Sequence, residues 1–550
     1  MTVPSVDDLR RDLRERGYLS HAIERWFAHD PFTAGRSSRA FWLELATVAA
    51  KAALLVALFA IVPLVAIMLF RNHPLSAGET LLMSLLYGVT GFAISFLLLV
   101  AIALILKLRP ALAIDTPRGL LAISFAAAAL LAAPIALWWV RFPATPSWPE
   151  LLTGIAAVAA FFLIATIAIS AALLSFSIYE LQRIPAIHQK PRGVPMTIAA
   201  AILIAFLFLP TFLAQDSRTS EPPLQVVTTW MPYVVTLIGV DGLTYELGRD
   251  RLSRLGVFST IAPIAPMPGA SATERWASVG TGVPTAIHGV RAVDGVRFRG
   301  GRHLLQSVSP VDFVLRDVAE AVRLAAREPL PPTVRRRDYV WEIFAARSVP
   351  ALSVNWWTTD DVQGGTLDEI SQKSVFAAAS TPRVSAEFDA TRVDGVASER
   401  LFSESQREHP RFATVYLPAL DIILNRLPLD PPTQLAASVR ALENLDRTIA
   451  QTGGEVILVG LPGDGQSGHG VIAFKLPAGL PMTRAPGSAF DVAPTLCALL
   501  GFPPSEEMPG RSVIGNMTRI ATYGPRINTA APAKVNEEYY ENLKSLGYIR

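Results

Sequence analysis

Five long apolar segments in the first two-fifths of the chain limit what it can fold into. They cover residues 52–70, 81–106, 120–140, 151–174 and 196–213. Each is long enough to cross about 30 Å of hydrocarbon as an α-helix. About forty polar or mixed residues precede the first segment, a pattern that does not fit a cleaved secretion signal. We therefore predict a transmembrane domain of five helices at residues 41–214, after an N-terminal segment at residues 1–40.

Basic residues cluster in alternate connections between these segments. The clusters are Arg10, Arg11, Arg14, Arg16, Arg25, Arg36 and Arg39 before the first segment, Lys107, Arg109 and Arg118 before the third, and Arg183, Lys190 and Arg192 before the fifth. The other two connections contain Arg71 and Arg141. Because basic loops stay in the cytoplasm, we predict a multi-pass protein of the plasma (inner) membrane with a cytoplasmic N-terminus. An odd number of spans then places the remainder of the chain outside, in the periplasm or its equivalent.

The apolar segments themselves indicate little about chemistry. None carries a charge near its middle, so no ion or proton pathway is indicated. We interpret them as an anchor in membrane lipid and as a possible surface for a membrane-protein partner. The formal charge of +3 is small for 550 residues and gives no support to nucleic-acid binding. Cys497 is the single cysteine, which excludes an intrachain disulfide and a multi-cysteine metal cluster.

After a polar, proline-containing linker at residues 215–232, the chain reads as an α/β domain at residues 233–550. Apolar runs typical of buried strands lie at 234–240, 351–357, 412–418, 455–461 and 470–474, and helical patterns lie at 311–327, 338–348, 432–453 and 490–501. This alternation predicts a mainly parallel sheet with helices on both faces. Ligands bind beyond the carboxyl ends of such strands. Asp241 follows the first strand, either as a site residue or as a loop aspartate that caps backbone amides.

Six motifs in this outer half, in their order and spacing, carry a family resemblance. They are VVTLIGVDGL, RWASVGTGVPTAIHGV, DYVWEIFAARSVPALSVNWWTT, VYLPALD, FDVAPTLCALLGFPPSEEMPGRSV and YYENLKSLGYI. From residue 233 to the last residue, the chain resembles the type I phosphodiesterase/nucleotide pyrophosphatase family of the alkaline phosphatase superfamily, which has a sulfatase-like fold. The resemblance implies two adjacent divalent metals, usually zinc, and a Ser or Thr nucleophile. Two such cations ionise the hydroxyl and stabilise both oxygens of an in-line displacement at phosphorus.

The resemblance places the nucleophile four residues before the tryptophan of the second motif. Ala272 occupies that position, and its methyl group cannot attack. Ser271 and Thr273 flank it and would supply a hydroxyl after a one-residue shift; the alternative is that they are turn or cap residues. Glu274 and Arg275 also replace the apolar residues that the resemblance implies just before the tryptophan.

The implied metal ligands are only partly present. Asp241 and Asp421 stand where the resemblance places two carboxylates. The histidine expected four residues after the second carboxylate is Asn425, a poor zinc ligand. Leu461 and Pro462 replace the Asp and His expected after the strand at 455–461, and neither can bind a metal.

The final histidine of the family pattern corresponds to His469, which is either a ligand or an exposed loop residue. Asp464 is a weaker substitute that requires a rebuilt loop. We interpret His288 as structural and Asp491 as a helix N-cap. Asp241, Asp421 and His469 would suffice for one divalent metal such as zinc; the alternative is no metal, and a two-metal site is not expected.

These losses favour a membrane-anchored pseudoenzyme, a phosphodiesterase-like domain kept for ligand binding or assembly. One alternative is an active metal-dependent phosphodiesterase, phosphatase or sulfatase-type hydrolase with a rearranged site and Ser271 or Thr273 as nucleophile. Another makes the membrane domain the working part, in lipid handling or partner recruitment. Residues 302–410 are expected to include a cap, because their patterning is loose and caps are typical of the superfamily.

Overall fold

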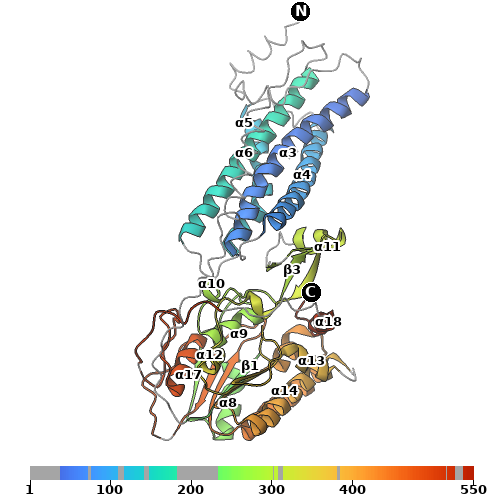
Figure 1. The fold of residues 1–550 in the computed structure, drawn as a ribbon. Helices are drawn as coiled ribbons and strands as arrows, with labels where there is room; N and C mark the ends of the chain where they lie inside the picture. Colours follow the sequence, from blue (N-terminus) through green and yellow to red (C-terminus); the bar gives the residue numbers. More distant parts are fainter. Residues whose placement is uncertain are drawn as a thin grey trace, which may run out of the picture. The chain divides into compact units, whose positions relative to one another are not determined.

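The computed structural model divides into two compact units, one of residues 1–217 with 296–326 and the other of residues 218–295 with 327–550 (Figure 1). The residues described are 38–71, 76–108, 117–141, 148–181, 233–301, 303–306, 314–380, 385–477, 479–515, 517–526 and 537–549. Four apolar helices are followed in the chain by an α/β domain with a mostly parallel sheet.

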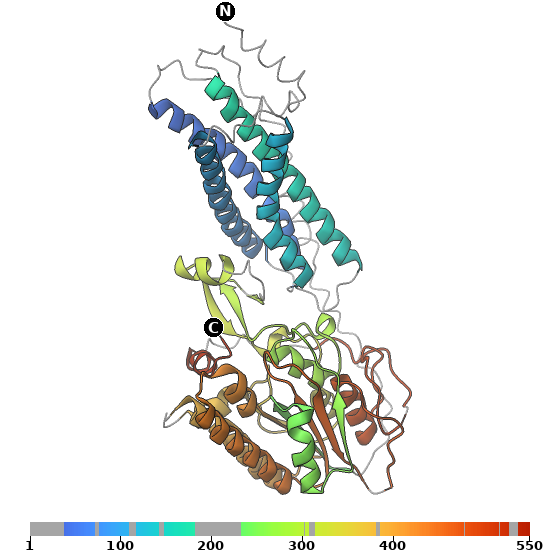
Figure 2. The same cartoon turned by 180° about the vertical axis from the view of Figure 1, so that it is seen from behind.

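The first unit contains a bundle of four long helices, which Figure 2 shows from behind. They are α3 (Ser38–Arg71), α4 (Ala77–Leu108), α5 (Pro117–Arg141) and α6 (Trp148–Leu181). Their apolar stretches, each long enough to span a membrane, are Leu45–Ala66, Ala77–Ile105, Arg118–Leu137 and Leu151–Leu174. The first four predicted segments are therefore helices of membrane-spanning length. The fifth, at 196–213, lies outside the described residues, as do residues 1–37 and the linker at 215–232.

Small residues let these helices approach closely. Ala49, Ala52 and Ala53 on α3 are fully buried. On α4, a Cβ at Gly91 would lie 3.7 Å from the Cα of Ala57. Packing of this kind, by van der Waals contact of small side chains, stabilises helix pairs where lipid removes the hydrophobic driving force.

A segment from the middle of the α/β sequence also belongs to the first unit. It forms a three-stranded sheet in the order β4-β3-β5, from β3 (Asp294–Phe298), β4 (Leu304–Leu305) and β5 (Ala325–Pro329), with a π-helical turn η3 (Val314–Val318) and α11 (Ala319–Ala321) before β5. Val296, Phe298 and Leu315 are buried in the same apolar cluster as the bundle helices. The helix predicted at 311–327 is thus wrong beyond residue 321. Arg323 adopts a positive φ of 57°, and the next residues pair with β3 instead.

Glu79, in the first turn of α4, binds this segment. Its carboxylate is 3% exposed. It accepts hydrogen bonds from the backbone N–H of His303 (2.9 Å) and from the hydroxyl of Ser76 (2.8 Å), and lies 2.7 Å from Nδ1 of His303. A Cβ at Gly301 would lie 2.6 Å from Oε1 of Glu79, so glycine permits the close approach. The contact fixes the start of α4 to Gly301 and His303.

The second unit contains a seven-stranded sheet in the order β2-β10-β9-β1-β8-β6-β7. The strands are β1 (Val235–Asp241), β2 (Thr260–Ile264), β6 (Ala351–Val354), β7 (Leu367–Ile370), β8 (Phe412–Leu417), β9 (Glu455–Leu461) and β10 (Gly470–Lys475). All pairs from β9 to β7 are parallel, whereas β10 pairs antiparallel with both of its neighbours, β9 and β2. Central β1 is buried along its whole length, as its unbroken apolar sequence predicts.

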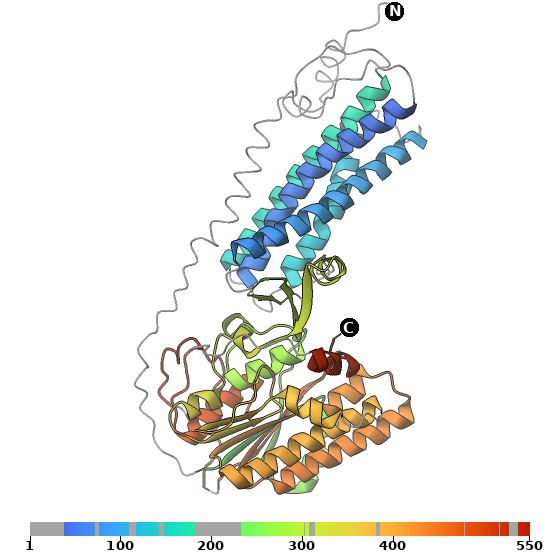
Figure 3. The same ribbon diagram turned by 45° about the vertical axis from the view of Figure 1, so that its right-hand side comes forward.

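Helices cover both faces of this sheet. In Figures 1 and 3, α9, α12 and α17 lie on one side and α13 and α14 on the other. The helices are α8 (Tyr245–Leu255), α9 (Ala272–Thr281), α10 (Thr285–His288), α12 (Val340–Ala345), α13 (Gln372–Ala379), α14 (Ala386–Glu408), α15 (Ala419–Asp421), α16 (Pro431–Gln451), α17 (Val492–Leu500) and α18 (Glu537–Ser545), with short turns η4 (Pro332–Val334), η5 (Ile422–Arg426) and η6 (Ala489–Asp491). The cap expected within 302–410 stays a prediction; inside that range, α14 packs along α16 and β8.

Candidate functional site

Asp241 is the last residue of β1, and its side chain is fully buried. It accepts a hydrogen bond from the Tyr416 hydroxyl (3.0 Å) and another from Nη2 of Arg275 (3.2 Å). Burial raises the pKa of Asp241 to about 6, and the charge of Asp421 adds to the rise, although the Arg275 guanidinium opposes it. The carboxylate predicted at this strand tip is present, and an arginine is bound to it.

Asp421 ends α15, directly after β8, and is also fully buried. Its carboxylate accepts hydrogen bonds from Nε of Arg426 (2.6 Å), Nδ2 of Asn425 (2.8 Å) and the backbone N–H of Asp464 (2.9 Å). Asn425, at the position of an implied histidine ligand, therefore donates to the carboxylate. Asp421 is held by hydrogen-bond donors on several sides.

The two aspartates lie at neighbouring strand ends, because β1 pairs directly with β8. A Cβ at Gly242 would lie 2.6 Å from the backbone nitrogen of Asp421, so the chain after β1 touches α15. Gly242 also has a φ of +84°, which a side chain would strain. Asp241, Arg275, Asp421 and Arg426 together form what we term the strand-tip cluster. Its two carboxylates and two guanidiniums balance in formal charge.

Aromatic side chains close this cluster. The Arg426 guanidinium lies 4.1 Å from the centre of the Tyr548 ring, in cation–π geometry. The hydroxyl of Tyr548 lies 3.4 Å from that of Tyr416. Burial raises the pKa of both tyrosines well above the ordinary range. The arginine side chains of the cluster are each 5% exposed, so the charges are shielded from water.

The structure places Ala272 at the start of α9, buried, with Ser271 as N-cap. Ser271 accepts from the N–H of Glu274 and donates to the carbonyl of Arg291 (2.6 Å). The Thr273 hydroxyl is fully buried and donates to the carbonyl of Ala292 (2.6 Å). Both hydroxyl protons are therefore engaged with the loop at 291–292, as expected of cap residues. The side chain that α9 directs to Asp241 is Arg275, one turn further on.

The loop after β9 packs its backbone against Asp421. Leu461 and Pro462 are buried, and the Leu461 carbonyl accepts from the N–H of Gly242 (2.8 Å). A Cβ at Gly463 would lie 1.9 Å from Oδ1 of Asp421, so only glycine fits there. The Asp464 side chain is 58% exposed and lies 3.5 Å from Nη1 of Arg426. Asp464 thus contributes its N–H to the cluster while its carboxylate faces solvent.

His469 is exposed, and its described contact is a backbone one, from its carbonyl to the N–H of Tyr245 (2.9 Å). Within the described part of the chain, no group of three or more His, Cys, Asp or Glu side chains is placed to hold a metal. Asp241 and Asp421 are each already paired with a guanidinium. The donor set at the strand tips therefore does not fit the two-metal centre that the family resemblance implies.

His288 is structural, as its sequence context suggests. It is fully buried, its Nδ1 accepts from the N–H of Val290 (3.1 Å), and its Nε2 lies 2.9 Å from the Ser278 hydroxyl. Because Nδ1 is an acceptor, Nε2 carries the proton and donates to Ser278. Burial, reinforced by nearby arginines, lowers the pKa of His288 to about 3. Its ring is therefore neutral and fixes the turn after α9.

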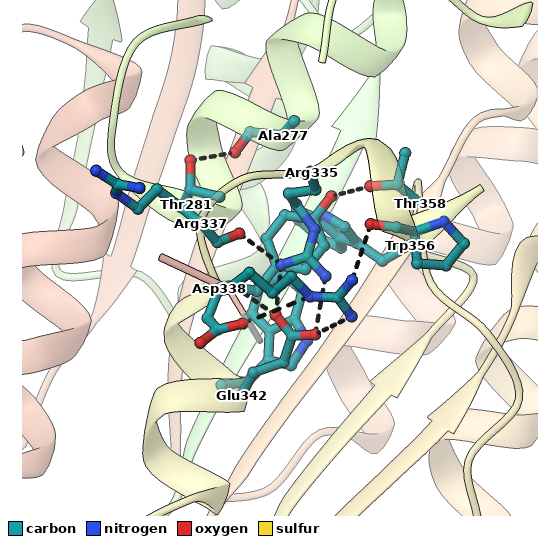
Figure 4. A network of polar contacts seen from close by, with 12 residues as sticks. Ala277, Thr281, Arg335, Arg337, Asp338, Glu342, Trp356 and Thr358 are labelled. Carbon is teal, nitrogen blue, oxygen red and sulfur yellow. Dashed lines mark hydrogen bonds and ion pairs between the residues drawn. The ribbon is translucent and has the colours of Figure 1, made fainter. Parts of the chain in front are cut away.

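A second group of buried charges lies at the start of α12 (Figure 4). Arg335 is fully buried and pairs through both Nη atoms with Glu342, at 2.8 Å for Nη2. Arg526 also reaches Glu342 (3.0 Å) and lies 3.4 Å from Asp338. Burial disfavours ionisation of Glu342, but the two arginines outweigh it and lower its pKa. Burial raises the pKa of Asp338 to about 6.

Glu369, on β7, lies beside this group. It accepts a hydrogen bond from Nε1 of Trp341 (3.2 Å). Burial raises the pKa of Glu369 to about 8, and the charge of Glu342 adds to the rise. We term Arg335, Asp338, Glu342, Glu369 and Arg526 the α12 cluster. It joins α12, the loop before it, β7 and a segment near the end of the chain.

Comparisons with known proteins give weak similarities. No family model and no curated protein matches the chain. Solved structures similar to it include phosphonoacetate hydrolase from Sinorhizobium meliloti in complex with phosphonoformate (13% identity, 44% of this chain, 60% of that chain, TM-score 0.28). Another is an inactive form of murine ectonucleotide pyrophosphatase/phosphodiesterase 5 in complex with AMP (12% identity, 42% of this chain, 56% of that chain, TM-score 0.26).

A third is a protein in the alkaline phosphatase superfamily from Vibrio parahaemolyticus (11% identity, 60% of this chain, 90% of that chain, TM-score 0.30). The chain spans 60% of the length of the hydrolase and 56% of that of the phosphodiesterase. At these identities and TM-scores, the similarities by themselves assign neither a family nor an activity.

Proposed function

We propose that the chain is a membrane-anchored, non-catalytic member of the alkaline phosphatase superfamily, close to its type I phosphodiesterase branch. One observation carries this proposal: guanidiniums of Arg275 and Arg426 are bound to the two carboxylates that the family resemblance assigns to metals. Without dications and a nucleophilic hydroxyl, neither covalent attack nor neutralisation of the transition state is available. The outer domain would then serve in ligand binding or assembly.

The test is a joint measurement of metal and turnover on full-length protein purified without chelator. We expect substoichiometric zinc, and hydrolysis of bis(p-nitrophenyl) phosphate and p-nitrophenyl phosphate no faster than by an Asp241→Ala variant. Ala272→Ser restores a hydroxyl but not the charge, so it should also leave turnover at that level. Two tightly bound metals per chain, or zinc-stimulated turnover well above the Asp241→Ala control, would overturn the proposal.

We also propose five spans, with a cytoplasmic N-terminus and an extracytoplasmic α/β domain. The contact of Glu79 with His303 supports this, because it ties the start of α4 to a segment whose two ends continue directly into that domain. If α3 to α6 cross the membrane in alternation, α6 ends at Leu181 on the side opposite to the start of α4. One further crossing is then required before residue 233, and we assign it to the apolar run at 196–213.

Single-cysteine labelling of intact cells tests this topology. With Cys497 replaced by alanine, a cysteine at Ser217 or Ser403 should react with a membrane-impermeant maleimide, whereas one at Ser5 should react only after lysis. Labelling of Ser5 and protection of Ser403 would contradict the orientation. Protection of Ser5 and Ser403 alike before lysis would show that the crossing at 196–213 is absent.

A further inference from the structure

A cavity of about 360 Å³ lies where the parallel strands of the seven-stranded sheet begin, opposite the strand ends that hold the strand-tip cluster. Its lining includes Val234 and Ala413, at the starts of β1 and β8, and residues from the last turns of α14 and α16. Parallel strands run from this edge to the carboxyl edge that holds Asp241 and Asp421. The cavity is therefore separate from the strand-tip cluster, and its volume lies in the range of small-molecule sites.

The cavity wall is polar without being formally charged. Among the described residues that line it there is no Asp, Glu, Lys or Arg. Hydroxyl and amide side chains make up most of the polar lining, together with one imidazole; they are Thr236, Ser398, Ser405, Gln406, His409, Thr448, Gln451 and Thr452. Among these lining residues a phosphate or carboxylate would find no Arg or Lys, and a metal ion would find no carboxylate and a single imidazole, that of His409. The lining favours a ligand that is itself neutral and hydrogen-bonding.

Two buried hydroxyls of the lining have spare acceptors. The Ser398 and Thr448 oxygens lie 2.6 Å apart, and they also lie 2.8 Å from the carbonyls of Asp394 and Asn444 respectively. The two hydroxyls have two protons between them, and these are used up by the three contacts. The hydroxyl oxygens still have free lone pairs, which can accept further hydrogen bonds. A ligand that meets this pair must donate hydrogen bonds to it.

The helix ends reinforce the preference for donors. α14 ends at Glu408 and α16 at Gln451, so both present the negative ends of their dipoles near the cavity. The Ser405 carbonyl is capped by the N–H of His409, and that of Ile449 by the N–H of Thr452. Other carbonyls of a last helical turn have no partner within the helix. An anion is disfavoured here, and hydroxyl donors are favoured.

The cavity also has an apolar wall. Phe402 lines it from α14 and is 43% exposed, and Leu401 lies beside it. An aromatic ring next to hydroxyl and amide groups suits a ligand with one apolar face and a polar rim. A sugar ring has that character, since its C–H groups form an apolar face and its hydroxyls both donate and accept.

We propose that this cavity binds a neutral, polyhydroxylated ring, such as one unphosphorylated hexose unit of a carbohydrate. Ser398, Thr448 and the amides of Gln406 and Gln451 bind its hydroxyls, and Phe402 covers its apolar face. This site does not depend on whether the strand-tip cluster is catalytic. The proposed ligand lies beside Val234, where the chain enters the first strand of the α/β domain.

The test is binding of D-glucose, D-galactose, D-mannose and maltose to the full-length protein in detergent, by saturation-transfer NMR and calorimetry. Glucose 6-phosphate and glucuronate are the charged counterparts. Phe402→Ala and Ser405→Phe, which remove the apolar face and fill the cavity, should weaken binding about tenfold or more. Ser403→Ala, on the same helix but outside the lining, is the matched control and should leave affinity unchanged.

Three results would overturn the proposal: no neutral sugar of the panel binds at millimolar concentration, a charged counterpart binds more tightly than its neutral parent, or the Phe402 and Ser405 variants bind like the Ser403 control. Circular dichroism of each variant separates a lost site from a lost fold, because Ser405→Phe lies at a half-buried surface position. Hydrolysis assays on the same samples report on the strand-tip cluster, so the two proposals fail separately.

Discussion

The strand-tip cluster and the α12 cluster are both built from buried arginines and carboxylates, yet they are balanced differently. At the strand tips, Asp241 and Asp421 each have their own arginine. In the α12 cluster, Arg335 and Arg526 both bind Glu342, and Arg526 also lies near Asp338. Two arginines are thus set against three acids, and burial raises the pKa of Glu369 to about 8. The comparison shows that arginines of the protein neutralise the two carboxylates at the strand tips. A metal there would compete with guanidiniums already in place.

The largest expected effect is that of Arg426→Met, which breaks the strand-tip cluster. It leaves Asp421 buried without its cationic partner, and breaking such a pair is destabilising by about 3–5 kcal/mol. Denaturant unfolding of the α/β domain, followed by tryptophan fluorescence, measures the loss. Arg249→Met removes the exposed pair with Asp250 and should leave the unfolding free energy unchanged. A loss from Arg426→Met as small as the control's would show that the cluster is not a structural core.

Glu369→Gln addresses the α12 cluster through pH. The folded pKa of Glu369 is raised from 4.5 to about 8, so its stabilising contribution is full below pH 4.5 and is lost as pH rises through about 8. Glutamine keeps the acceptor for Trp341 and cannot ionise, so the variant should lack this loss, on the order of 3 kcal/mol. Unfolding free energies between pH 5 and about pH 9 test this; parallel profiles for wild type and variant would refute it.

The double variant Asp421→Asn with Arg426→Met sharpens the comparison. Removing both charges avoids an isolated buried ion, so it should be less destabilising than Arg426→Met alone by about 2 kcal/mol. Asparagine keeps an acceptor for the N–H of Asp464. A double-mutant cycle from the same unfolding curves gives the coupling. Simple additivity of the two single changes would mean that the pair is not an ion pair in solution.

Asp241→Asn should change the pH dependence of stability, and by less than Glu369→Gln does. The pKa of Asp241 is raised from 3.8 to about 6, so its contribution is present below pH 3.8 and lost as pH rises through about 6. The loss should be smaller than that for Glu369, because the pKa of Asp241 is raised by less, and it should disappear in the variant. It falls in a lower pH window than that of Glu369, so the two clusters can be told apart in one titration. Coinciding windows would remove the distinction.

The smallest expected effect is that of metal removal. Because guanidiniums neutralise the strand-tip carboxylates, EDTA should leave the melting temperature of the α/β domain unchanged, and added zinc should not raise it. The same EDTA and zinc treatments of Arg426→Met are informative, because Asp421 has lost its guanidinium partner in that variant and can interact with an added cation. A fall in the melting temperature of the wild type with EDTA would mean that the strand tips hold a metal.

The sequence predicted the central strands well because they are buried on both faces and are therefore continuously apolar. It did not predict α14, which is rich in charged residues. A signal was nevertheless present: Ala390, Val393, Ala397 and Leu401 recur at helical spacing and are all buried. The helix predicted at 311–327 followed local propensity, whereas pairing with β3 decided the structure of its last residues.

At the candidate site, sequence reasoning identified what was lost but not what replaced it. Each missing ligand can be read from a single position, as at Asn425 or Leu461. The replacement depends on contacts between distant residues, such as Arg275 with Asp241. Arg426 offered a signal, because a new cation stands next to a lost ligand. Tyr548 belongs to the terminal motif YYENLKSLGYI, but nothing in that motif relates the end of the chain to β8.

The segment at 296–326 has a consequence for how the protein can be produced. Its buried Phe298, Leu305 and Val314 share an apolar core with the bundle helices, although the chain reaches them only after completing α10. A truncated product that begins at residue 233 would leave these side chains without cover and prone to self-association. Recombinant work on the α/β half alone should therefore either delete residues 296–326 or co-express the helices that cover their apolar side chains.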